Sequence, residues 1–244
     1  MILTALLFVV AIIAGAVAAV AGFGIGSLLT PVMALRFPVK LAIAIVSIPH
    51  FIGTAARFVR LRQHVDRSVF INFGIFSAIG GLLGALLSAR ANSPALSIVF
   101  GCLLIFAGVS GLIGLTERMR FGRRTAWVAG AFSGFFGGLV GNQGGIRSAG
   151  LLGFDVRKEA LIATATAIAL IVDGARMPVY FYAEHHGIFA AWPLIIGATI
   201  GVLIGTLWGV RLLRKIPESK FRKILSALIT ALGVYMIARV SYRA

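Results

Sequence analysis

Two arginines, Arg57 and Arg176, are the residues whose type and spacing most directly predict chemistry in this chain. They are 119 positions apart, and the same interval separates two glycine-rich breaks, residues 22–26 and 141–145, that interrupt long apolar runs. An arginine fork matches the oxygens of a small oxyanion and keeps its charge at physiological pH. Arginine inside an apolar segment is by default a functional-site hypothesis. The interval predicts a duplicated chain with one anion-binding arginine in each half; arginines that reach lipid phosphates from helix ends are the alternative.

The glycines of the two breaks supply the backbone part of the expected site. A helix that restarts after each break, near Ser27 and near Ile146, presents free N–H groups and the positive end of its dipole to an anion. Glycine suits such a turn because it reaches positive φ and has no side chain. The alternative is that these glycines only let helices cross closely. The expected substrate-binding glycines are Gly22, Gly24, Gly26, Gly141, Gly144 and Gly145.

Three polar residues follow or lie within the second break. The amides of Asn142 and Gln143 can donate to a small oxyanion without adding charge, or they cap the broken helix. Arg147 is one turn further along, where the first half has Leu28. It either attracts the anion or extends toward the lipid headgroups.

Two titratable residues are candidates for coupling. Asp173 lies three residues before Arg176, on the same helical face, so the two can pair. The pair is either structural or a proton site that couples protonation of Asp173 to release of substrate from Arg176. His50 follows Pro49 in an apolar segment and can titrate near neutral pH; a hydrogen-bonded core histidine is the alternative.

Composition places the chain in a lipid bilayer. Of 244 residues, 59% are hydrophobic and 12% charged, and the mean hydropathy is +1.01. The net charge of +16 does not indicate a nucleic-acid partner, because the basic residues lie in short loops between apolar segments, as the positive-inside rule describes. We expect no cofactor and no metal: residues 184–186, Glu-His-His, read as a solvated external loop. Cys102, the single cysteine, is expected to pack within a helix.

The expected fold is an all-α integral membrane protein of two inverted repeats, residues 1–119 and 120–244. Each repeat contains a re-entrant, broken-helix hairpin and three membrane spans of about 20 apolar residues. The first repeat has the hairpin 1–35 and spans 39–60, 68–90 and 94–116; the second has the hairpin 125–152 and spans 157–182, 187–212 and 217–240.

The distribution of Lys and Arg predicts the topology. If the segments 1–35 and 125–152 each cross the membrane once, the two sides carry 11 and 10 basic residues; if both return as hairpins, the sides carry 16 and 5. The second division follows the positive-inside rule, with basic loops in the cytoplasm and both termini outside. Each half then has an odd number of crossings, so the second half is inverted relative to the first.

Glycines recur at every fourth position on two predicted helices. Such faces let helix backbones approach closely. They favour tight internal packing, and a homodimer interface is the alternative. The glycines are Gly130, Gly134 and Gly138 on one helix, and Gly197, Gly201, Gly205 and Gly209 on the other.

A glycine-rich broken helix followed by Pro31, its repeat in the second half, and duplicated apolar helices over essentially the whole chain resemble the TauE/SafE family. The resemblance implies a transporter of sulfite or organosulfur anions in a bacterial inner membrane, so the termini that the charge distribution places outside are expected in the periplasm. One departure is that Ile25 stands where the family tends to have consecutive glycines.

We therefore expect a secondary transporter, not an enzyme, that exports a small sulfur-containing anion by alternating access at a midplane site between the two broken helices. Proton coupling is an open feature. An anion channel of the same architecture is the alternative, since positive half-helix ends and buried arginine also suit a selectivity filter. An intramembrane enzyme with a Ser27–His50 dyad is a third and much weaker hypothesis. The chain contains no Walker motif, GxxxxGK[ST], for ATP binding.

Overall fold

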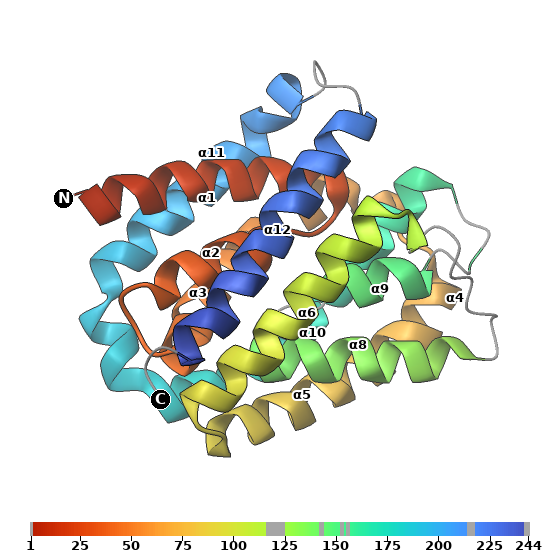
Figure 1. The fold of residues 1–244 in the computed structure, drawn as a ribbon. Coiled ribbons are helices and arrows are strands. Elements are labelled where there is room, and N and C mark those ends of the chain that lie inside the picture. The colour runs from red at the N-terminus through yellow and green to blue at the C-terminus, as the bar shows by residue number, and fades with distance from the viewer. Residues whose placement is uncertain are drawn as a thin grey trace.

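The computed structural model describes residues 2–115, 125–141, 144–151, 154, 157–213 and 218–241, and their regular structure is entirely helical (Figure 1). The all-helical prediction is confirmed for these residues. The helices, in chain order, are α1 (Ile2–Ala21), α2 (Ile25–Ala34), α3 (Val39–Leu61), the 3₁₀ turn η1 (Arg62–His64), α4 (Arg67–Val69), the π-helical turn η2 (Phe70–Gly74), α5 (Ile75–Arg90), α6 (Ser93–Leu112), α8 (Ala126–Val140), α9 (Gly144–Leu151), α10 (Lys158–Ala190), α11 (Trp192–Leu213) and α12 (Glu218–Ser241).

Long apolar helices account for the membrane character of the chain. Six in the described part are long and apolar enough to cross a bilayer: Thr4–Ala21, Val39–His64, Arg67–Arg90, Ser93–Leu112, Glu159–Ala190 and Lys223–Val240. Each of the six predicted spans contains a helix. However, α1 meets this length criterion, whereas the apolar part of α11, Trp192–Trp208, is shorter. The assignment of α1 to a re-entrant hairpin stays a prediction.

Glycine ends the first helix of each broken pair. Gly22, after α1, has φ +80°, and Gly141, after α8, has φ +75°, so both adopt the left-handed conformation that is common after a helix C-terminus. Gly24, with φ +132°, then precedes α2. The second helices begin at Ile25 and Gly144, two residues earlier than expected, so Gly26, Gly144 and Gly145 are helical. Asn142 and Gln143 lie outside the described residues.

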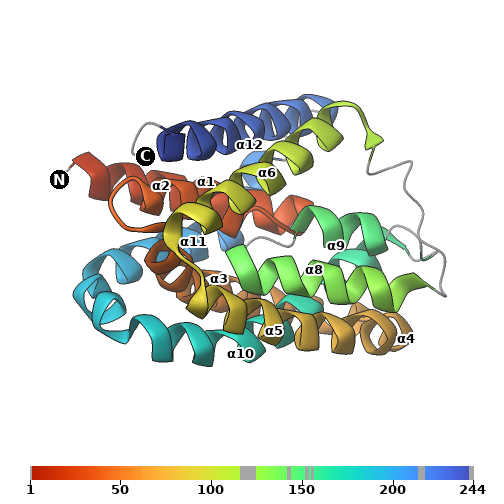
Figure 2. The same cartoon turned by 60° about the horizontal axis from the view of Figure 1, so that its bottom comes forward.

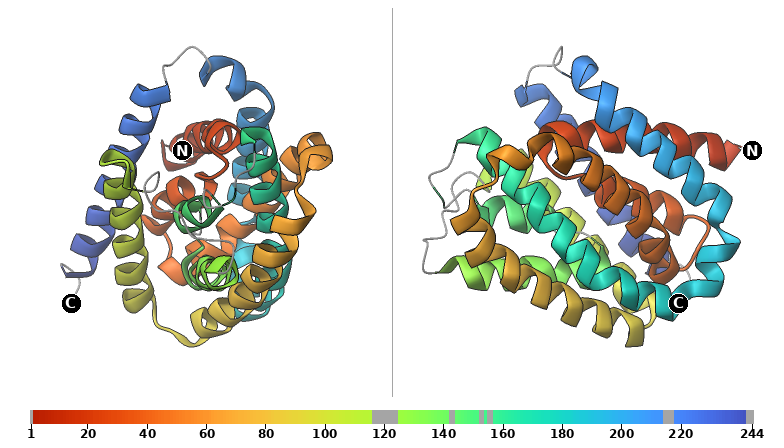
Figure 3. Two further views of the ribbon diagram at one scale, coloured as in Figure 1. Left: turned by 90° about the vertical axis from the view of Figure 1, so that its right-hand side faces the viewer. Right: turned by 180° about the vertical axis from the view of Figure 1, so that it is seen from behind.

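The helices pack in pairs that join the two halves of the chain. Helix α1 lies along α11, and α5 lies along α8. Helices α3 and α10 contact each other, and α6 and α12 lie side by side as an outer layer on the other side of the molecule (Figures 2 and 3). The two broken pairs, α1 with α2 and α8 with α9, lie in the middle of this arrangement (Figure 3, left).

The glycine faces pack inside the molecule. A Cβ on Gly134 of α8 would collide with the carbonyl oxygen of Ser77 on α5, and a Cβ on Gly205 of α11 would collide with that of Ile12 on α1. Gly197 is different, since its Cβ position has no neighbouring atom within 4 Å in the described part of the chain. The internal-packing interpretation is confirmed for the contacting glycines, because their missing side chains let the backbones touch.

These contacts also show where the two halves differ in length. Gly80 on α5 contacts Ala131 on α8, and Gly205 on α11 makes the equivalent contact with Ile12 on α1. Ile12 and Ala131 are 119 positions apart, as the repeat requires, but Gly80 and Gly205 are 125 apart. Compared with the first half, the second half therefore has six extra residues between Arg176 and α11. They extend α10 to Ala190, with a kink at Glu184, where φ is −129° and ψ is 17°.

Two local expectations were wrong. Residues 184–186 belong to the kinked helix α10, not to a loop. Glu184 Oε1 forms an ion pair with Lys40 Nζ at 3.9 Å. The extra residues keep the chain helical past the position where the first half turns. Cys102 is exposed on the outer face of α6 instead of packing inside. The apolar outer face of this helix, which includes Ile98 and Phe106, accommodates a cysteine as it does other apolar residues.

Candidate anion site

Two polar helix faces meet at the centre of the molecule. On α3, Ser47, His50 and Arg57 are buried at helical spacing, and on α10 Thr166 and Asp173 are buried in the same way. His50 Nδ1 lies 2.6 Å from Asp173 Oδ2, and Arg57 Nε donates to Thr166 Oγ1 at 3.0 Å. Because the second contact is seven residues later on α3 and seven residues earlier on α10, the two helices run antiparallel.

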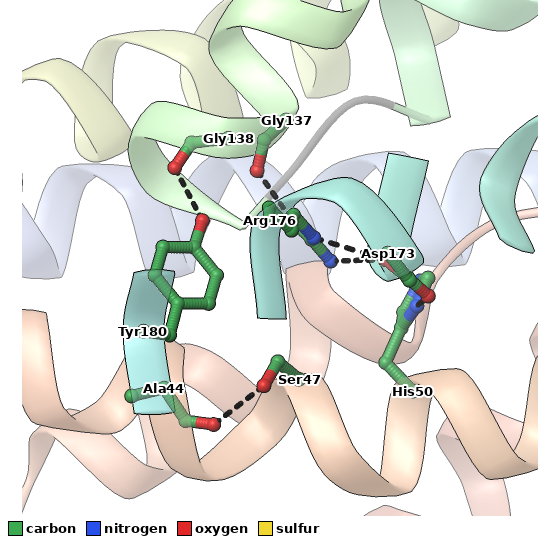
Figure 4. A network of polar contacts seen from close by, with 8 residues as sticks. All are labelled: Ala44, Ser47, His50, Gly137, Gly138, Asp173, Arg176 and Tyr180. Atoms are coloured by element: carbon green, nitrogen blue, oxygen red, sulfur yellow. Dashed lines mark hydrogen bonds and ion pairs between the residues drawn. The ribbon is translucent and has the colours of Figure 1, made fainter. Parts of the chain in front are cut away.

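Asp173 connects α3 to Arg176 (Figure 4). Arg176 Nε donates to Asp173 Oδ1 at 2.9 Å, and Nη2 lies 2.7 Å from the same oxygen. Its Nη1 donates to the carbonyl oxygen of Gly137, and the Tyr180 hydroxyl donates to that of Gly138. Asp173 therefore uses one oxygen for Arg176 and the other for His50, and its charge is fully engaged.

Arg57 makes the equivalent contact in the first half. Its Nη1 donates to the carbonyl oxygen of Ala18, 39 residues earlier in the chain. Gly137 likewise lies 39 residues before Arg176. The difference lies in the second partner, because the hydroxyl of Thr166 is neutral and itself donates to Ile162 O at 2.7 Å. Arg57 and Arg176 are 5% and 1% exposed. Such burial contradicts the alternative in which they reach lipid phosphates.

The side chains of Arg57 and Arg176 contact the C-terminal ends of α1 and α8, respectively. The Ala18 oxygen also accepts from the Gly22 N–H at 3.0 Å, and the Gly137 oxygen from the Gly141 N–H at 2.9 Å. A cation at a helix C-terminus is favourable because the terminal carbonyl groups carry partial negative charge. Each arginine thus stabilises the helix end that forms its glycine break.

The two breaks contact each other. A Cβ on Gly26 would lie 2.5 Å from the carbonyl oxygen of Gly141, and a Cβ on Gly144 would collide with Phe23. Gly22 is buried, and no described atom lies within 4 Å of its Cβ position. The glycine segments therefore meet inside the molecule.

Arg147, on α9, is a third buried arginine. It is 2% exposed, and its Nε and Nη1 atoms have no hydrogen-bond partner. It interacts electrostatically with Arg57, Asp173 and Arg176. Its burial contradicts the alternative in which it extends toward the headgroups. The free Nε and Nη1 groups of this buried guanidinium can each donate a charge-assisted hydrogen bond to an oxyanion.

Sequence reasoning missed three polar residues of these faces. Thr166 and Tyr180 lie ten residues before and four residues after Arg176, so helical spacing places them on its face. Thr54 occupies the position in the first half that Asp173 has in the second; its hydroxyl is buried without a partner. The spacing indicated the faces, but only the antiparallel contact of α3 and α10 joins them.

The fold and the site together define a class of protein: a multi-pass, all-helical membrane protein whose buried polar centre lies between two broken helices. Residues 7–236 match the family model described as "Sulfite exporter TauE/SafE". The chain belongs to this family of membrane transporters. Comparisons with curated proteins and with solved structures gave no match.

Proposed function

We propose that this chain is a secondary transporter that exports a small sulfur-containing oxyanion, sulfite or an organosulfonate, from the cytoplasm. The observation that carries the proposal is Arg147, which is buried with Nε and Nη1 unpartnered. An uncompensated buried ion costs several kcal/mol, about what one bound anion with good hydrogen bonds can offset. The family match supports the class of substrate.

The backbone of the breaks supplies the remaining part of the proposed site. The N-terminal N–H groups of α2 and α9 have no helical acceptor and point back toward the breaks. Gly24 lacks a side chain that could cap α2. We assign Asn142 and Gln143 as further hydrogen-bond donors to the anion. The backbone around the anion is supplied by Gly22, Gly24, Gly26, Gly141, Gly144 and Gly145. Arg57 and Arg176 position this backbone by binding the preceding helix ends, and their charge attracts the anion.

Alternating access follows from an inverted repeat. Helices α3 and α10 are equivalent members of the two halves and run antiparallel, which supports opposite orientations of the halves in the bilayer. Arg57 is buried and no longer counts as a loop residue, so the basic residues divide 15 to 5. This bias supports cytoplasmic basic loops and periplasmic termini in an inner membrane. A homodimer stays a prediction.

Proton coupling is assigned to His50 and Asp173. Protonation of this pair weakens the bond between Asp173 and Arg176, which in turn holds the end of α8. A change of charge at one position can therefore alter the geometry of the second break. Arg57 lacks an acidic partner at the equivalent position, so coupling is confined to the second half.

Counterflow of radiolabelled sulfite in proteoliposomes tests the proposal. We expect saturable exchange by the wild-type protein and a loss of about 100-fold in Arg147→Gln, because two charge-assisted hydrogen bonds at ~1.5 kcal/mol or more each are removed. Arg60→Gln is the matched control, since Arg60 is exposed near the end of α3. Ohmic current without saturation would establish a channel instead. No exchange of sulfite, sulfonates or carboxylates would overturn the proposed function.

A further inference from the structure

The net charge of the buried centre determines which ligand charge fits it best. This inference rests on the proposed function. Over the described residues, the buried ionic side chains are Arg57, Arg147, Arg176 and Asp173. With His50 neutral, the centre carries a charge of +2. We propose that the site selects a doubly charged anion over a singly charged anion of the same size.

The position of the single acid determines which charges remain. Asp173 bonds Arg176 through Oδ1 and His50 through Oδ2, so it neutralises Arg176. Arg57 bonds a threonine hydroxyl and a carbonyl oxygen, which are neutral groups, and Nε and Nη1 of Arg147 have no partner. Among the residues that the structure describes, no acid is left to pair with these two guanidinium charges.

The asymmetry of the repeat explains this excess. The first half has Thr54 where the second has Asp173, each three residues before its arginine. The Thr54 hydroxyl is buried and unpartnered, so it neither neutralises nor hydrogen-bonds Arg57. An acid here would reproduce the Asp173–Arg176 pair and lower the charge by one. The absence of an acid at this position therefore sets the valence of the site.

No other described acid reaches the centre. Glu159 is exposed, Asp66 is half-buried beside the turn after α3, and Glu184 is half-buried beside Lys40. Glu117, Asp155 and the side chain of Glu218 lie outside the part of the chain that the structure describes. The helix ends contribute little net charge, because each break places the negative C-terminal end of one helix beside the positive N-terminal end of the next.

This charge favours the dianionic form of sulfite over bisulfite, both of which are present near neutral pH. A second ligand charge near an unpaired guanidinium is attracted by it, and the desolvation of that charge offsets part of the gain. After that cost, we expect a preference of about tenfold or more.

Sulfoacetate and isethionate test the proposal because they share a two-carbon sulfonate skeleton. The first carries a carboxylate and has two charges; the second carries a hydroxyl and has one. Binding is measured as the rise in melting temperature of the purified full chain over a concentration series. Transport is measured separately, as competition with radiolabelled sulfite. We expect sulfoacetate to act at concentrations at least about tenfold lower than isethionate.

Thr54→Asp and Thr54→Asn are the paired variants. They add side chains of the same shape, of which only the aspartate carries a charge. We expect the tenfold preference to persist in Thr54→Asn and to shrink or reverse in Thr54→Asp. Arg147→Gln, which also lowers the charge by one, reaches the same centre from a different helix. It is expected to lose the preference as well, whether or not Thr54→Asp folds.

The outcomes separate the inference from the proposed function. Equal binding of both anions by the wild-type protein overturns charge selection, and so does a preference that survives both charge-lowering variants. Dianion-selective stabilisation without counterflow leaves charge selection standing and overturns export. Failure of every anion to bind or exchange overturns both.

Discussion

Arg57 and Arg176 each donate a hydrogen bond from Nη1 to the backbone carbonyl oxygen of the residue 39 positions earlier in the chain, Ala18 and Gly137. In each case this carbonyl also accepts the N–H of the left-handed glycine that ends the helix. The same arginine contact thus stabilises both broken helices. The second partner differs: Asp173 is charged, whereas Thr166 is neutral. This difference leads to unequal effects of mutating the two arginines.

Replacement of Arg176 by Gln should destabilise the protein more than the same change at Arg57. Arg176→Gln leaves Asp173 as a buried carboxylate without its main cation, which costs about 3–5 kcal/mol. Arg57→Gln leaves a hydroxyl and a carbonyl oxygen under-bonded, which costs about 1–3 kcal/mol. Melting temperatures of the purified proteins in one detergent measure the order.

The double variant Asp173→Asn/Arg176→Gln checks the cause. Because it removes both members of the ion pair, we expect it to melt above the single variant Arg176→Gln. Equal destabilisation by Arg57→Gln and Arg176→Gln, without recovery in the double variant, would show that the ion pair does not determine the difference.

Arg147→Gln should behave in the opposite way. Nε and Nη1 of Arg147 have no partner, so its removal relieves an uncompensated charge. Without substrate, we expect an unchanged or higher melting temperature. Added sulfite should stabilise the wild-type protein according to its saturation, and should stabilise Arg147→Gln only at about 100-fold higher concentrations. A strongly destabilised Arg147→Gln protein would mean that this arginine has a structural role.

A methyl group at Gly26 should disrupt the contact between the two breaks. A Cβ there would lie 2.5 Å from the Gly141 carbonyl oxygen, and backbone cannot move aside as a flexible side chain can. We expect Gly26→Ala to cost about 1–3 kcal/mol, the usual range for overpacking, and to lower transport. The melting temperature and sulfite counterflow of the same preparation measure both effects.

Gly174→Ala is the matched control for this substitution. Gly174 is also helical, but no atom of the described residues lies within 4 Å of its Cβ position. Alanine in a helix is favoured over glycine by about 0.5–1 kcal/mol, so we expect a neutral or slightly stabilised protein. If both glycine variants behave alike, the contact between the breaks is not important for packing.

Single cysteines should be labelled from opposite sides of the membrane. In a Cys102→Ser background, Gln63→Cys lies in the turn after α3, and Ser93→Cys lies at the start of α6. The proposed topology places the first in the cytoplasm and the second in the periplasm. A membrane-impermeant thiol reagent on intact cells should label Ser93→Cys immediately but Gln63→Cys only after permeabilisation. The reverse pattern would invert the topology.

Replacement of Asp173 by Asn should remove the pH dependence of transport. The amide keeps the shape of the carboxyl group but carries no charge, so protonation of His50 or of this position no longer changes the bond to Arg176. We expect wild-type counterflow to respond to an imposed pH gradient and Asp173→Asn counterflow to ignore it. A gradient response that persists in Asp173→Asn would assign coupling to another group.

Local features of the sequence were sufficient to predict the helices and the breaks. Apolar runs of spanning length predicted a helix within each of the six expected spans, because hydropathy and helix periodicity depend on neighbouring residues alone. Gly22 and Gly141 were recognisable as breaks for the same reason, since positive φ favours glycine whatever surrounds it. The sequence repeat also predicted that Arg57 and Arg176 occupy equivalent positions in the two halves.

Tertiary structure alone decided which polar groups meet. His50 and Asp173 are 123 positions apart, and their contact depends on the antiparallel packing of α3 against α10. The burial of Arg147 depends on how α9 is enclosed, which no local pattern reports. Six extra residues in α10 shift the register of the second half while leaving its helix character unchanged. Charge neutralisation requires two groups to be close in space, so it is decided by packing between helices and not by the composition of either helix.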